Sequence, residues 1–375
     1  MDRWWHPDRL ASRRDRLVAR GRILAATRQF FADEGFTEVE TPVLQVSPGI
    51  EPHLRAFATL LNDPRDNSLR PRYLHTSPEF AMKKLLAGGM ERIWQLTHAF
   101  RDGERGATHH PEFAMLEWYR TGATHDALMV DCEALLRRCA HSIRHSRESG
   151  NPGKATERLL LAPRLRGGDE MGNGSTVVSW QGKSADPNHA FERLSVADAF
   201  TRHTGIDILA TAPDPDRPDL ALLSEAAASI GIAPHPGDDW ESLYFRIFLD
   251  RIEPQLGIGR PTFLYDYPVS MAALSRQKPG DPRLCERFEL YVCGLELANA
   301  FTELTDPAEQ RGRFIADQAR KQRLYGHTYP IDDDFLAALE HGLPDCTGIA
   351  LGFDRLVMLC TGADSIEDVL WAPVD

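Results

Sequence analysis

The chain has 375 residues, of which 42% are hydrophobic and 26% charged, and its formal net charge at pH 7 is −12. This composition fits a globular protein with one large core. The acidic balance argues against a strongly basic nucleic-acid-binding protein, although a local basic patch stays compatible with it. The Arg-rich residues 1–22 lack the apolar stretch of a signal peptide, and no membrane-length apolar run follows. We therefore expect a cytoplasmic protein without a membrane segment.

The spacing of the cysteines also indicates a cytoplasmic protein. None of the six cysteines forms a C-x-x-C pair, the usual spacing of zinc ligands and redox motifs. We therefore expect reduced thiols in a cytoplasmic protein, and neither a zinc site nor a disulfide framework.

The first region of periodic sequence runs from about Leu17 to Arg138. Leu17, Leu24 and Phe31 recur every seven residues, which places them on one side of a predicted helix. Gly35 would end this helix as a C′ glycine. After it we expect three strands and then a helix, at residues 36–44, 73–76, 92–101 and 127–138.

The second region, residues 142–188, is rich in Gly, Pro, Ser, Asn and Arg and has no sustained period. Such a composition cannot bury enough apolar surface to offset the entropy of ordering it. Gly174 and Gly182 do not form a phosphate-binding loop, because seven residues separate them, whereas that loop has four at this place. We predict a mostly disordered insertion within a single domain that covers residues 1–375.

The third region, residues 191–375, is periodic again. Helices are expected at 194–207, 238–256 and 307–326, and strands at 261–268 and, as a pair or a bent strand, at 287–304. Residues 347–362 are expected to form a strand, a turn and a helix. Antiparallel strands flanked by helices predict the α+β class. No strand is followed by G-x-G-x-x-G, so a dinucleotide-binding fold has no support.

Residues 100–120, FRDGERGATHHPEFAMLEWYR, carry the most distinctive chemistry. If a strand begins at Phe113, alternate residues as far as Tyr119 share one face, and Glu117 is among them. Arg101, at the end of the preceding strand, suits a phosphate because guanidinium is permanently charged and binds in a bidentate way. The ring of Phe113 suits a purine. The alternative is an ordinary hairpin with surface ion pairs.

The C-terminal sequence GIALGFDRLVMLCTG also contains an arginine in a position that suits an anion. Gly348 and Gly352 flank a short apolar strand, and Arg355 falls in the first turn of the next helix. A cation at a helix N-terminus opposes the helix dipole, which favours anions there. Such an unfavourable placement indicates a ligand anion near Arg355, and an arginine that faces solvent is the alternative.

Two of these segments resemble motifs of the class II aminoacyl-tRNA synthetases. Phe100-Arg101-x-x-Glu104, followed by His109-x-x-x-Phe113, resembles motif 2, and GIALGFDRL resembles motif 3. The resemblance implies an α+β catalytic domain with an antiparallel sheet flanked by helices.

The helix that precedes VETPVL resembles motif 1, in which Pro42 corresponds to the proline of the dimer interface. The segments HTSPEFAMKKLL, HPEFAMLEWY and LELANAFTEL are similar to the lysyl-tRNA synthetase branch. Because the motif 1 helix begins near Leu17, no room is left for an N-terminal anticodon-binding barrel. In this respect the chain resembles the family of elongation factor P–(R)-β-lysine ligases.

The resemblance implies a reaction. Members of that family activate β-lysine with ATP and transfer it to the ε-amine of one lysine on elongation factor P. We therefore expect ATP and Mg²⁺ as cofactors, elongation factor P and β-lysine as partners, a cytoplasmic homodimer, and no tRNA binding. Two alternatives stay open: a truncated lysyl-tRNA synthetase that charges tRNA, and a catalytically dead paralogue that acts as a regulatory module.

The resemblance also implies an ATP site. Arg101 would hold the α-phosphate, Arg355 the γ-phosphate, and Phe113 would stack on adenine opposite the Arg355 guanidinium. Glu296 would hold Mg²⁺ through ATP. The implied catalytic residues are Arg101, Arg355 and Glu296, and the remaining ATP-binding residues are Gly103, Glu104, His110, Phe113, Leu297 and Gly352.

Three positions in these segments depart from the synthetase pattern. Gly103 stands where the glutamate of motif 2 is usual, which leaves the adenine contact open between the Gly103 backbone and Glu104. His110 stands where asparagine is usual, and Ala300 replaces a usual glycine.

The implied substrate pocket consists of Ser77, Glu79, Tyr119, Ala298, Asn299 and Glu303. Glu296 and Glu303 are seven residues apart, so a straight strand would put them on opposite faces. If both serve the site, we expect a bend near Asn299–Ala300. Ala298, where related synthetases have glycine, is expected on the face of Glu296 and is predicted to select β-lysine over α-lysine by crowding an α-ammonium group.

Overall fold

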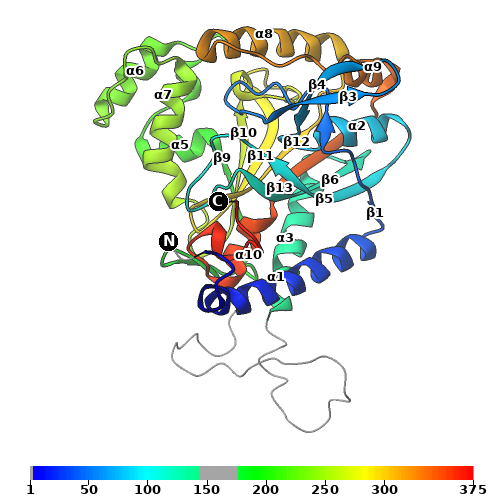
Figure 1. Ribbon diagram of the computed structural model, residues 1–375. Coiled ribbons are helices and arrows are strands. Elements are labelled where there is room, and N and C mark those ends of the chain that lie inside the picture. The colour runs from blue at the N-terminus through cyan, green and yellow to red at the C-terminus, as the bar shows by residue number, and fades with distance from the viewer. Residues whose placement is uncertain (1–2, 144–175, 216, 375) are drawn as a thin grey trace, which may run out of the picture.

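In the computed structural model, which describes residues 3–143, 176–215 and 217–374, an eight-stranded sheet forms the centre of the molecule (Figure 1). Its strands have the order β1-β5-β6-β13-β12-β11-β10-β9. The bounds of these strands are β1 (Thr37–Glu38), β5 (Arg92–Phe100), β6 (Glu112–Thr121), β9 (Glu192–Ser195), β10 (Thr262–Pro268), β11 (Leu284–Val292), β12 (Leu295–Thr302) and β13 (Cys346–Gly352).

The pairing within this sheet is antiparallel from β5 to β10, and only the outermost pairs, β1 with β5 and β9 with β10, are parallel. Strands β11 and β12 form a hairpin whose turn, Cys293-Gly294, has positive φ at both residues (59° and 75°). A two-residue turn of this kind matches the twist of the strands it connects. The predicted α+β class with an antiparallel sheet is confirmed.

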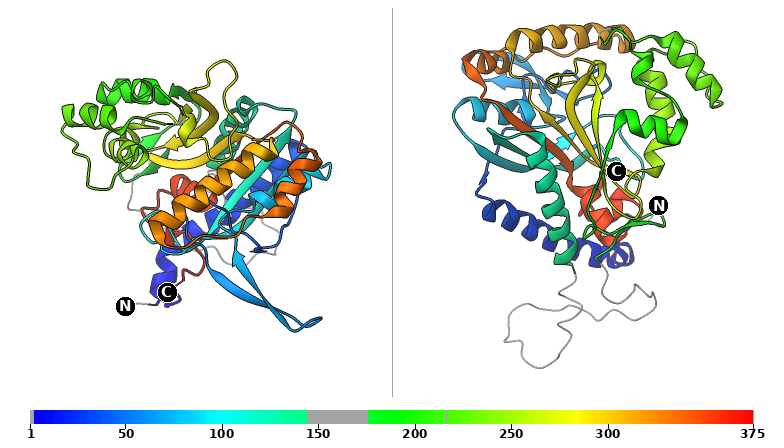
Figure 2. Two further views of the ribbon diagram at one scale, coloured as in Figure 1. Left: turned by 90° about the horizontal axis from the view of Figure 1, so that it is seen from above. Right: turned by 180° about the vertical axis from the view of Figure 1, so that it is seen from behind.

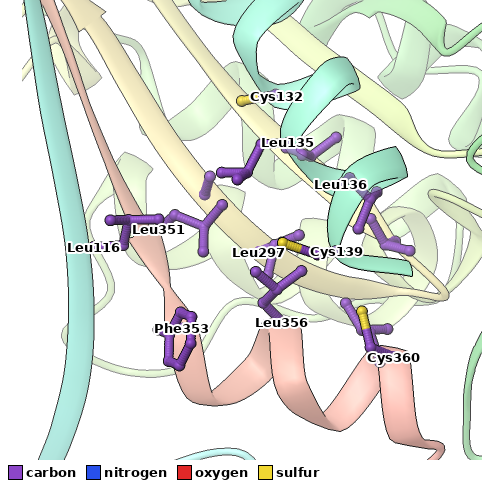
Figure 3. Close-up of a cluster of buried hydrophobic side chains, with 14 of the residues drawn as sticks. Leu116, Cys132, Leu135, Leu136, Cys139, Leu297, Leu351, Phe353, Leu356 and Cys360 are labelled. Atoms are coloured by element: carbon purple, nitrogen blue, oxygen red, sulfur yellow. The ribbon is translucent and has the colours of Figure 1, made fainter. Parts of the chain in front are cut away.

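Helices cover both faces of the sheet (Figure 1). One face packs against α1 (Pro7–Asp33), α3 (His125–Ser142) and α10 (Phe353–Thr361). Figure 3 shows the centre of this core, where Leu356 of α10 and Cys139 of α3 meet Leu297 of β12. The opposite face meets α2 (Glu79–Ala87), α8 (Pro307–Tyr325) and α9 (Asp333–Gly342).

A side lobe lies beside β9 and β10 and contains α5 (Val196–Thr204), α6 (Leu220–Ser229) and α7 (Trp240–Ile247). The helix predicted at 238–256 is shorter than expected. It ends at Ile247 and is followed by a π-helical turn (Phe248–Ile252) and a 3₁₀ turn (Glu253–Gln255). Pro254 lies in this last turn, and proline cannot continue an α-helix because it has no backbone N–H.

A second, small sheet consists of β2 (Leu44–Gln45), β4 (Ser68–Leu74) and β3 (Ala58–Asp63). Its β3–β4 hairpin projects from the body of the protein (Figure 2). None of the helices in the described ranges combines the length and the hydropathy that a membrane span requires.

The predicted insertion at 142–188 needs a correction at its C-terminal end. Residues 144–175 lie outside the described residues, but β7 (Val178–Trp180) and β8 (Lys183–Ala185) form a hairpin. Val178 and Ala185 are buried in the main core, and the thiol of Cys293 donates a hydrogen bond to the Val178 carbonyl (3.7 Å). Residues 178–185 therefore belong to the fold, because the apolar side chains of this short hairpin are buried against the rest of the protein.

Candidate active site

A cavity of about 490 Å³ opens on the sheet face opposite α1, α3 and α10. It is lined by β6, β11, β12 and β13, by α2, and by the loop between β5 and β6. Strand β12 connects its two ends, with Glu296 near the start and Glu303 directly after the strand. At about 3.3 Å per residue these two positions are roughly 20 Å apart. We call the part near Glu296 the arginine end, with Arg101, Arg287 and Arg355, and the part near Glu303 the carboxylate end, with Glu79, Glu117 and Glu303.

An irregularity in β12 brings both glutamates to the cavity. Tyr291 of β11 pairs with Glu296, but its neighbour Leu290 pairs with Ala298, so Leu297 is an additional residue in β12. A bulge of this kind shifts the alternation of side chains by one position. Glu296 and Glu303 therefore both line the cavity, as expected.

Two details of this prediction are wrong. The irregularity lies at Leu297 and not at Asn299–Ala300. As a result Ala298, like its partner Leu290, belongs to the core on the opposite face and does not share the face of Glu296.

At the arginine end, Arg355 is held by the loop between β5 and β6 and by β12. Its Nε donates to the Thr108 carbonyl (3.2 Å), its Nη1 donates to the Glu296 carbonyl (2.8 Å), and its Nη2 lies 2.9 Å from Nε2 of His109. Burial, followed by the charge of Arg355, lowers the pKa of His109. The two carbonyls and His109 are neutral partners, and the carboxylate paired with Arg355, Oε2 of Glu296, is 3.9 Å from its Nη1. This longer ion pair leaves the Arg355 guanidinium able to bind an anion.

Arg101, directly after β5, lies over the ring of Phe113, with 5.1 Å between its Cζ and the ring centroid. Its Nη1 is 3.8 Å from Oε1 of Glu104, and its buried Nε has no hydrogen-bond partner within the described part of the chain. Gly103, between the two charged residues, has a φ of 85°, a backbone conformation that suits glycine. The structure thus brings together the guanidinium, the aromatic ring and the acid that the motif predicts.

The two histidines of this loop have different surroundings. His110 is buried, and both of its ring nitrogens contact backbone: Nδ1 donates to the Glu112 carbonyl (2.5 Å) and Nε2 accepts from the Val374 N–H (3.1 Å). Both nitrogens are thus used within the protein, although the residue borders the cavity. The histidine in contact with a functional arginine is His109, which the sequence prediction did not assign.

Motif 3 connects this end to the rest of the fold. Gly352 is the N-cap of α10, and a Cβ at this position would meet only the side chain of Arg355, at 3.4 Å. Asp354 is buried between two other motifs, because it pairs with Arg20 of α1 and accepts a hydrogen bond from the Ala114 N–H of β6 (2.7 Å). The orientation of Arg355 at the start of α10 therefore depends on α1 and β6.

Besides Glu104, the arginine end contains the acidic residues Glu296 and Glu289. Loss of water contact in the cavity, and then the charge of Glu289, raise the pKa of Glu296. Glu289 accepts hydrogen bonds from the hydroxyls of Tyr267 and Tyr291 (both 2.5 Å) and pairs with Arg287 (2.6 Å).

These two carboxylates fit a magnesium ion that arrives with ATP, because a divalent cation would offset their mutual repulsion. Mg²⁺ in such sites takes one or two carboxylates together with phosphate oxygens and water. Among the described residues, no group of three or more His, Cys, Asp or Glu side chains is arranged to hold a metal ion.

At the carboxylate end, Glu117 is fully buried and accepts hydrogen bonds from Ser77 Oγ (2.5 Å) and the Tyr119 hydroxyl (3.0 Å). Burial, followed by the charge of Glu79, raises the pKa of Glu117 to about 8. Ser77 also accepts from the N–H of Glu79 at the start of α2 (3.1 Å). The predicted residues Ser77, Glu79 and Tyr119 are thus gathered around a carboxylate that the prediction did not assign.

Glu303 and Glu79 share a buried cation. Nζ of Lys83, on α2, lies 2.5 Å from Oε2 of Glu303 and 2.6 Å from Oε1 of Glu79. The side chains of Lys83 and Glu303 are 0% and 1% exposed, which makes this an interior ion pair and not a surface one. Burial raises the pKa of Glu303 to about 7, although the charge of Lys83 opposes that rise.

Gly348 allows this packing. A Cβ on Gly348 of β13 would lie 2.2 Å from Cε1 of Tyr119 and 2.4 Å from Oε1 of Glu303, closer than atoms can approach. Any larger residue would displace both side chains.

Besides His109, the sequence prediction did not assign the cavity residues Glu117, Arg287 and Glu289, or Lys83, which contacts two carboxylates of the cavity. Glu117 was predicted to share a face with Phe113 and Tyr119, so its position was a usable signal. Glu289 and Arg287 alternate with buried residues in β11, and the same period-two pattern points both toward the cavity. Lys83 has no comparable signal, because a lysine on a helix is ordinarily a solvated residue.

Comparisons with known proteins agree with this geometry. A model of the family described as tRNA synthetases class II (D, K and N) matches residues 2–375. The chain is 38% identical over 359 residues to a protein of Vibrio cholerae named elongation factor P–(R)-β-lysine ligase, covering 95% of this chain and 94% of that protein. Proteins of the same name from Yersinia enterocolitica and Klebsiella pneumoniae are each 37% identical, with 96% of this chain covered and 94% and 95% of theirs.

The fold, the three motifs and the family match show that the chain is a ligase of the class II aminoacyl-tRNA synthetase type. Within this class it belongs to the family of elongation factor P–(R)-β-lysine ligases, which confirms the resemblance found in the sequence.

Proposed function

We propose that this protein uses ATP to activate (R)-β-lysine as an acyl-adenylate and then transfers the β-lysyl group to the ε-amine of a lysine on elongation factor P. The observation that carries the proposal is one cavity with arginines at one end and buried carboxylates at the other, connected by β12. A triphosphate matches the first end and a diamine the second. The names of the relatives supply the particular amino acid and acceptor.

In the first step a carboxylate oxygen of β-lysine attacks the α-phosphorus of ATP, and the bond from that phosphorus to the leaving pyrophosphate breaks. Negative charge develops on both sides of the displacement, so fixed cations there lower the barrier. We assign Arg101 to the α-phosphate and Arg355 to the γ-phosphate. Mg²⁺, held by Glu296 with Glu289 beside it, would supply further charge neutralisation.

In the second step the neutral ε-amine of the acceptor lysine attacks the acyl carbon of the adenylate. An amide bond forms, the bond from the acyl carbon to the AMP oxygen breaks, and the amine loses a proton to solvent. The adenylate is positioned for this attack by the carboxylate end, where Glu79, Glu117 and Glu303 would face its two ammonium groups. Buried charges need partners of opposite sign, so the pocket favours a diamino acid over one with an apolar side chain.

We further propose that the protein is a cytoplasmic homodimer. Apolar side chains near Pro42 are exposed, namely Leu44 and Val46, and others are exposed on the β3–β4 hairpin, namely Leu60, Leu61 and Leu69. An exposed group of this kind is typical of a surface that a second molecule covers. Sedimentation equilibrium that yields the mass of one chain would contradict the dimer.

Pyrophosphate exchange with a panel of amino acids tests the activation step. We expect exchange to depend on ATP and on β-lysine, to be slower with α-lysine, and to be at background with leucine or glutamate. Exchange that is fastest with α-lysine and continues to aminoacylated tRNA would support the synthetase alternative. No exchange with any amino acid would support the inactive paralogue.

A further inference from the structure

The carboxylate end contains a cation of its own, and this cation determines how much negative charge the pocket offers. Glu79, Glu117 and Glu303 are three carboxylates, and Lys83 is one ammonium group, so two negative charges are left when all four are ionised. A β-lysine molecule carries two ammonium groups. The pocket and its proposed substrate are therefore matched in charge only because Lys83 is present.

Lys83 is well placed for this role. It lies on α2, is fully buried, and contacts two of the three carboxylates at 2.5 and 2.6 Å. Burial acts to lower the pKa of Lys83, but the charges of Glu303 and Glu79 prevail and raise it, so the ammonium form persists. A buried ammonium with two partners is a fixed part of the protein interior and not a mobile side chain.

Other titratable groups also face this cluster. From β6 these are Glu117 and Tyr119, and from β13 the thiol of Cys346. From the loop before β3, Glu51 lines the same cavity and its charge interacts with Glu79, but burial raises the pKa of Glu51, which favours its neutral form. Burial raises the pKa of both Tyr119 and Cys346 above their usual values, which keeps them neutral. The next lysine of α2, Lys84, faces away and pairs with Asp332 (2.9 Å) and Asp334 (2.8 Å) at α9.

We propose that Lys83 is a specificity-determining residue whose ammonium group cancels one pocket carboxylate and so matches the carboxylate end to a substrate with two ammonium groups. This inference rests on the proposed function. Lys83 acts through Glu79 and Glu303 and does not itself take part in the chemical steps.

Proton release on binding is the direct consequence. Burial raises the pKa values of Glu303 and Glu117 to about 7 and about 8, so at neutral pH both carboxyl groups are partly protonated. A diammonium ligand favours their ionised forms, so binding releases protons. The affinity for β-lysine then increases as the pH rises through this range, and it decreases as the pH is lowered. Without Lys83 the pKa of Glu303 rises further. Binding of β-lysine then releases more protons, and the increase in its affinity occurs at a higher pH.

Calorimetry of β-lysine binding in buffers with different ionisation enthalpies measures this release. For Lys83→Met, which removes the ammonium group and keeps an unbranched side chain only one atom shorter, we expect more protons released at pH 7 than in the wild type. Its dissociation constant should be about tenfold higher or more, since one pKa unit corresponds to a tenfold change. The difference in dissociation constant between Lys83→Met and the wild type should become smaller toward pH 9. The matched control, Lys84→Met, should behave like the wild type.

The same proton release and the same pH dependence in Lys83→Met and the wild type would overturn the inference. If Lys83→Met fails to fold, the wild type tests the charge match with 3-aminohexanoate and 6-aminohexanoate, each of which lacks one ammonium group. We expect β-lysine to release more protons than either analogue, and equal release would contradict the match. A wild type that gives no heat with β-lysine would contradict the proposed function itself, and this inference with it.

Discussion

The two ends of the cavity hold their charges in different ways. At the arginine end, Arg355 is bound by backbone carbonyls and a histidine, and Arg101 lies against an aromatic ring. At the carboxylate end, Glu303 and Glu79 are bound to Lys83, a buried side chain of opposite charge. The carboxylates paired with Arg355 and Arg101 are 3.9 and 3.8 Å away, so both guanidinium groups can still bind an anion. The carboxylates of Glu303 and Glu79 lie 2.5 and 2.6 Å from Lys83, so this internal ion pair cancels part of the negative charge. The first arrangement suits a polyanion that must enter and leave, and the second suits the selection of one substrate.

This difference predicts that changes at the arginine end act mainly on the rate of activation. Arg101→Ala removes a positive charge from the position proposed for the α-phosphate. A lost contact of this kind typically costs on the order of 10²–10³ in rate. Pyrophosphate exchange at saturating β-lysine measures the loss. Arg105→Ala is a suitable control, because Arg105 lies in the same loop, is exposed, and does not line the cavity. A rate of pyrophosphate exchange close to that of the wild type in Arg101→Ala would contradict the assignment of Arg101 to the α-phosphate.

Changes at the carboxylate end are predicted to act on affinity. Glu303→Gln keeps the shape of the side chain but removes the charge that faces Lys83 and the proposed ammonium group. A hydrogen bond to a charged group is worth about 1.5–3 kcal/mol, so we expect KM for β-lysine to rise roughly 10- to 150-fold. The rate at saturation should change much less. Glu286→Gln, on β11 outside the cavity, is the control. A fall in kcat with an unchanged KM would contradict the assigned difference between the ends.

A smaller effect is expected from a methyl group in the floor of the pocket. Ala298 was predicted to select between lysine isomers, but its side chain belongs to the core face. On the neighbouring strand β13, Ala350 lies on the cavity face and pairs with Asn299 on one side and Glu117 on the other.

We therefore expect Ala350→Gly to raise kcat/KM for α-lysine about tenfold relative to β-lysine, since one methyl-sized change is worth about 1–3 kcal/mol. Ala298→Gly should leave the preference unchanged and reduce stability by roughly 0.5–1 kcal/mol. Competition experiments with both isomers provide the measurement. A shift of preference in Ala298→Gly alone would restore the original interpretation.

The smallest effect is expected from a change that lies outside both ends of the cavity. Residues 144–175 have the composition of a linker and include none of the residues assigned to the site, and the cost of loop closure changes by only about 0.6 kcal/mol per doubling of length. Replacing them with a short Gly/Ser linker should preserve Tm, exchange and ligation. Extending the deletion to residue 185 should lower Tm, because Val178 and Ala185 are buried in the main core. Loss of ligation by the shorter deletion would show that the segment binds a partner.

The sequence predicted the arginine end more completely than the carboxylate end. Arg101, Phe113 and Arg355 belong to contiguous motifs, and the placement of each on its element could be derived from strand and helix geometry. Ser77, Glu79, Tyr119 and Glu303 were assigned through the resemblance alone. Lys83 could not be found, because its burial depends on contacts between α2 and the end of β12.

The fold shows the same contrast: elements that depend on local sequence were predicted, and features that depend on contacts between distant segments were not. The strand at 92–101 and the helix at 307–326 were predicted within a residue or two of β5 and α8. The bulge at Leu297 was misplaced, because a bulge is defined by the pairing of β12 with β11 and not by the sequence of β12. The hairpin at 178–185 was missed because a few apolar residues are buried by segments far from them in the chain.

Intact-mass spectrometry of elongation factor P tests the central claim, that this cavity joins a diamino acid to ATP for transfer to a protein. Elongation factor P would be incubated with this protein, ATP, Mg²⁺ and (R)-β-lysine, and the modified residue located by peptide mapping. We predict a mass increase of one lysyl residue on a single lysine. The increase should be absent without ATP and absent with Arg101→Ala. An unmodified elongation factor P, in the presence of β-lysine-dependent pyrophosphate exchange, would contradict the account.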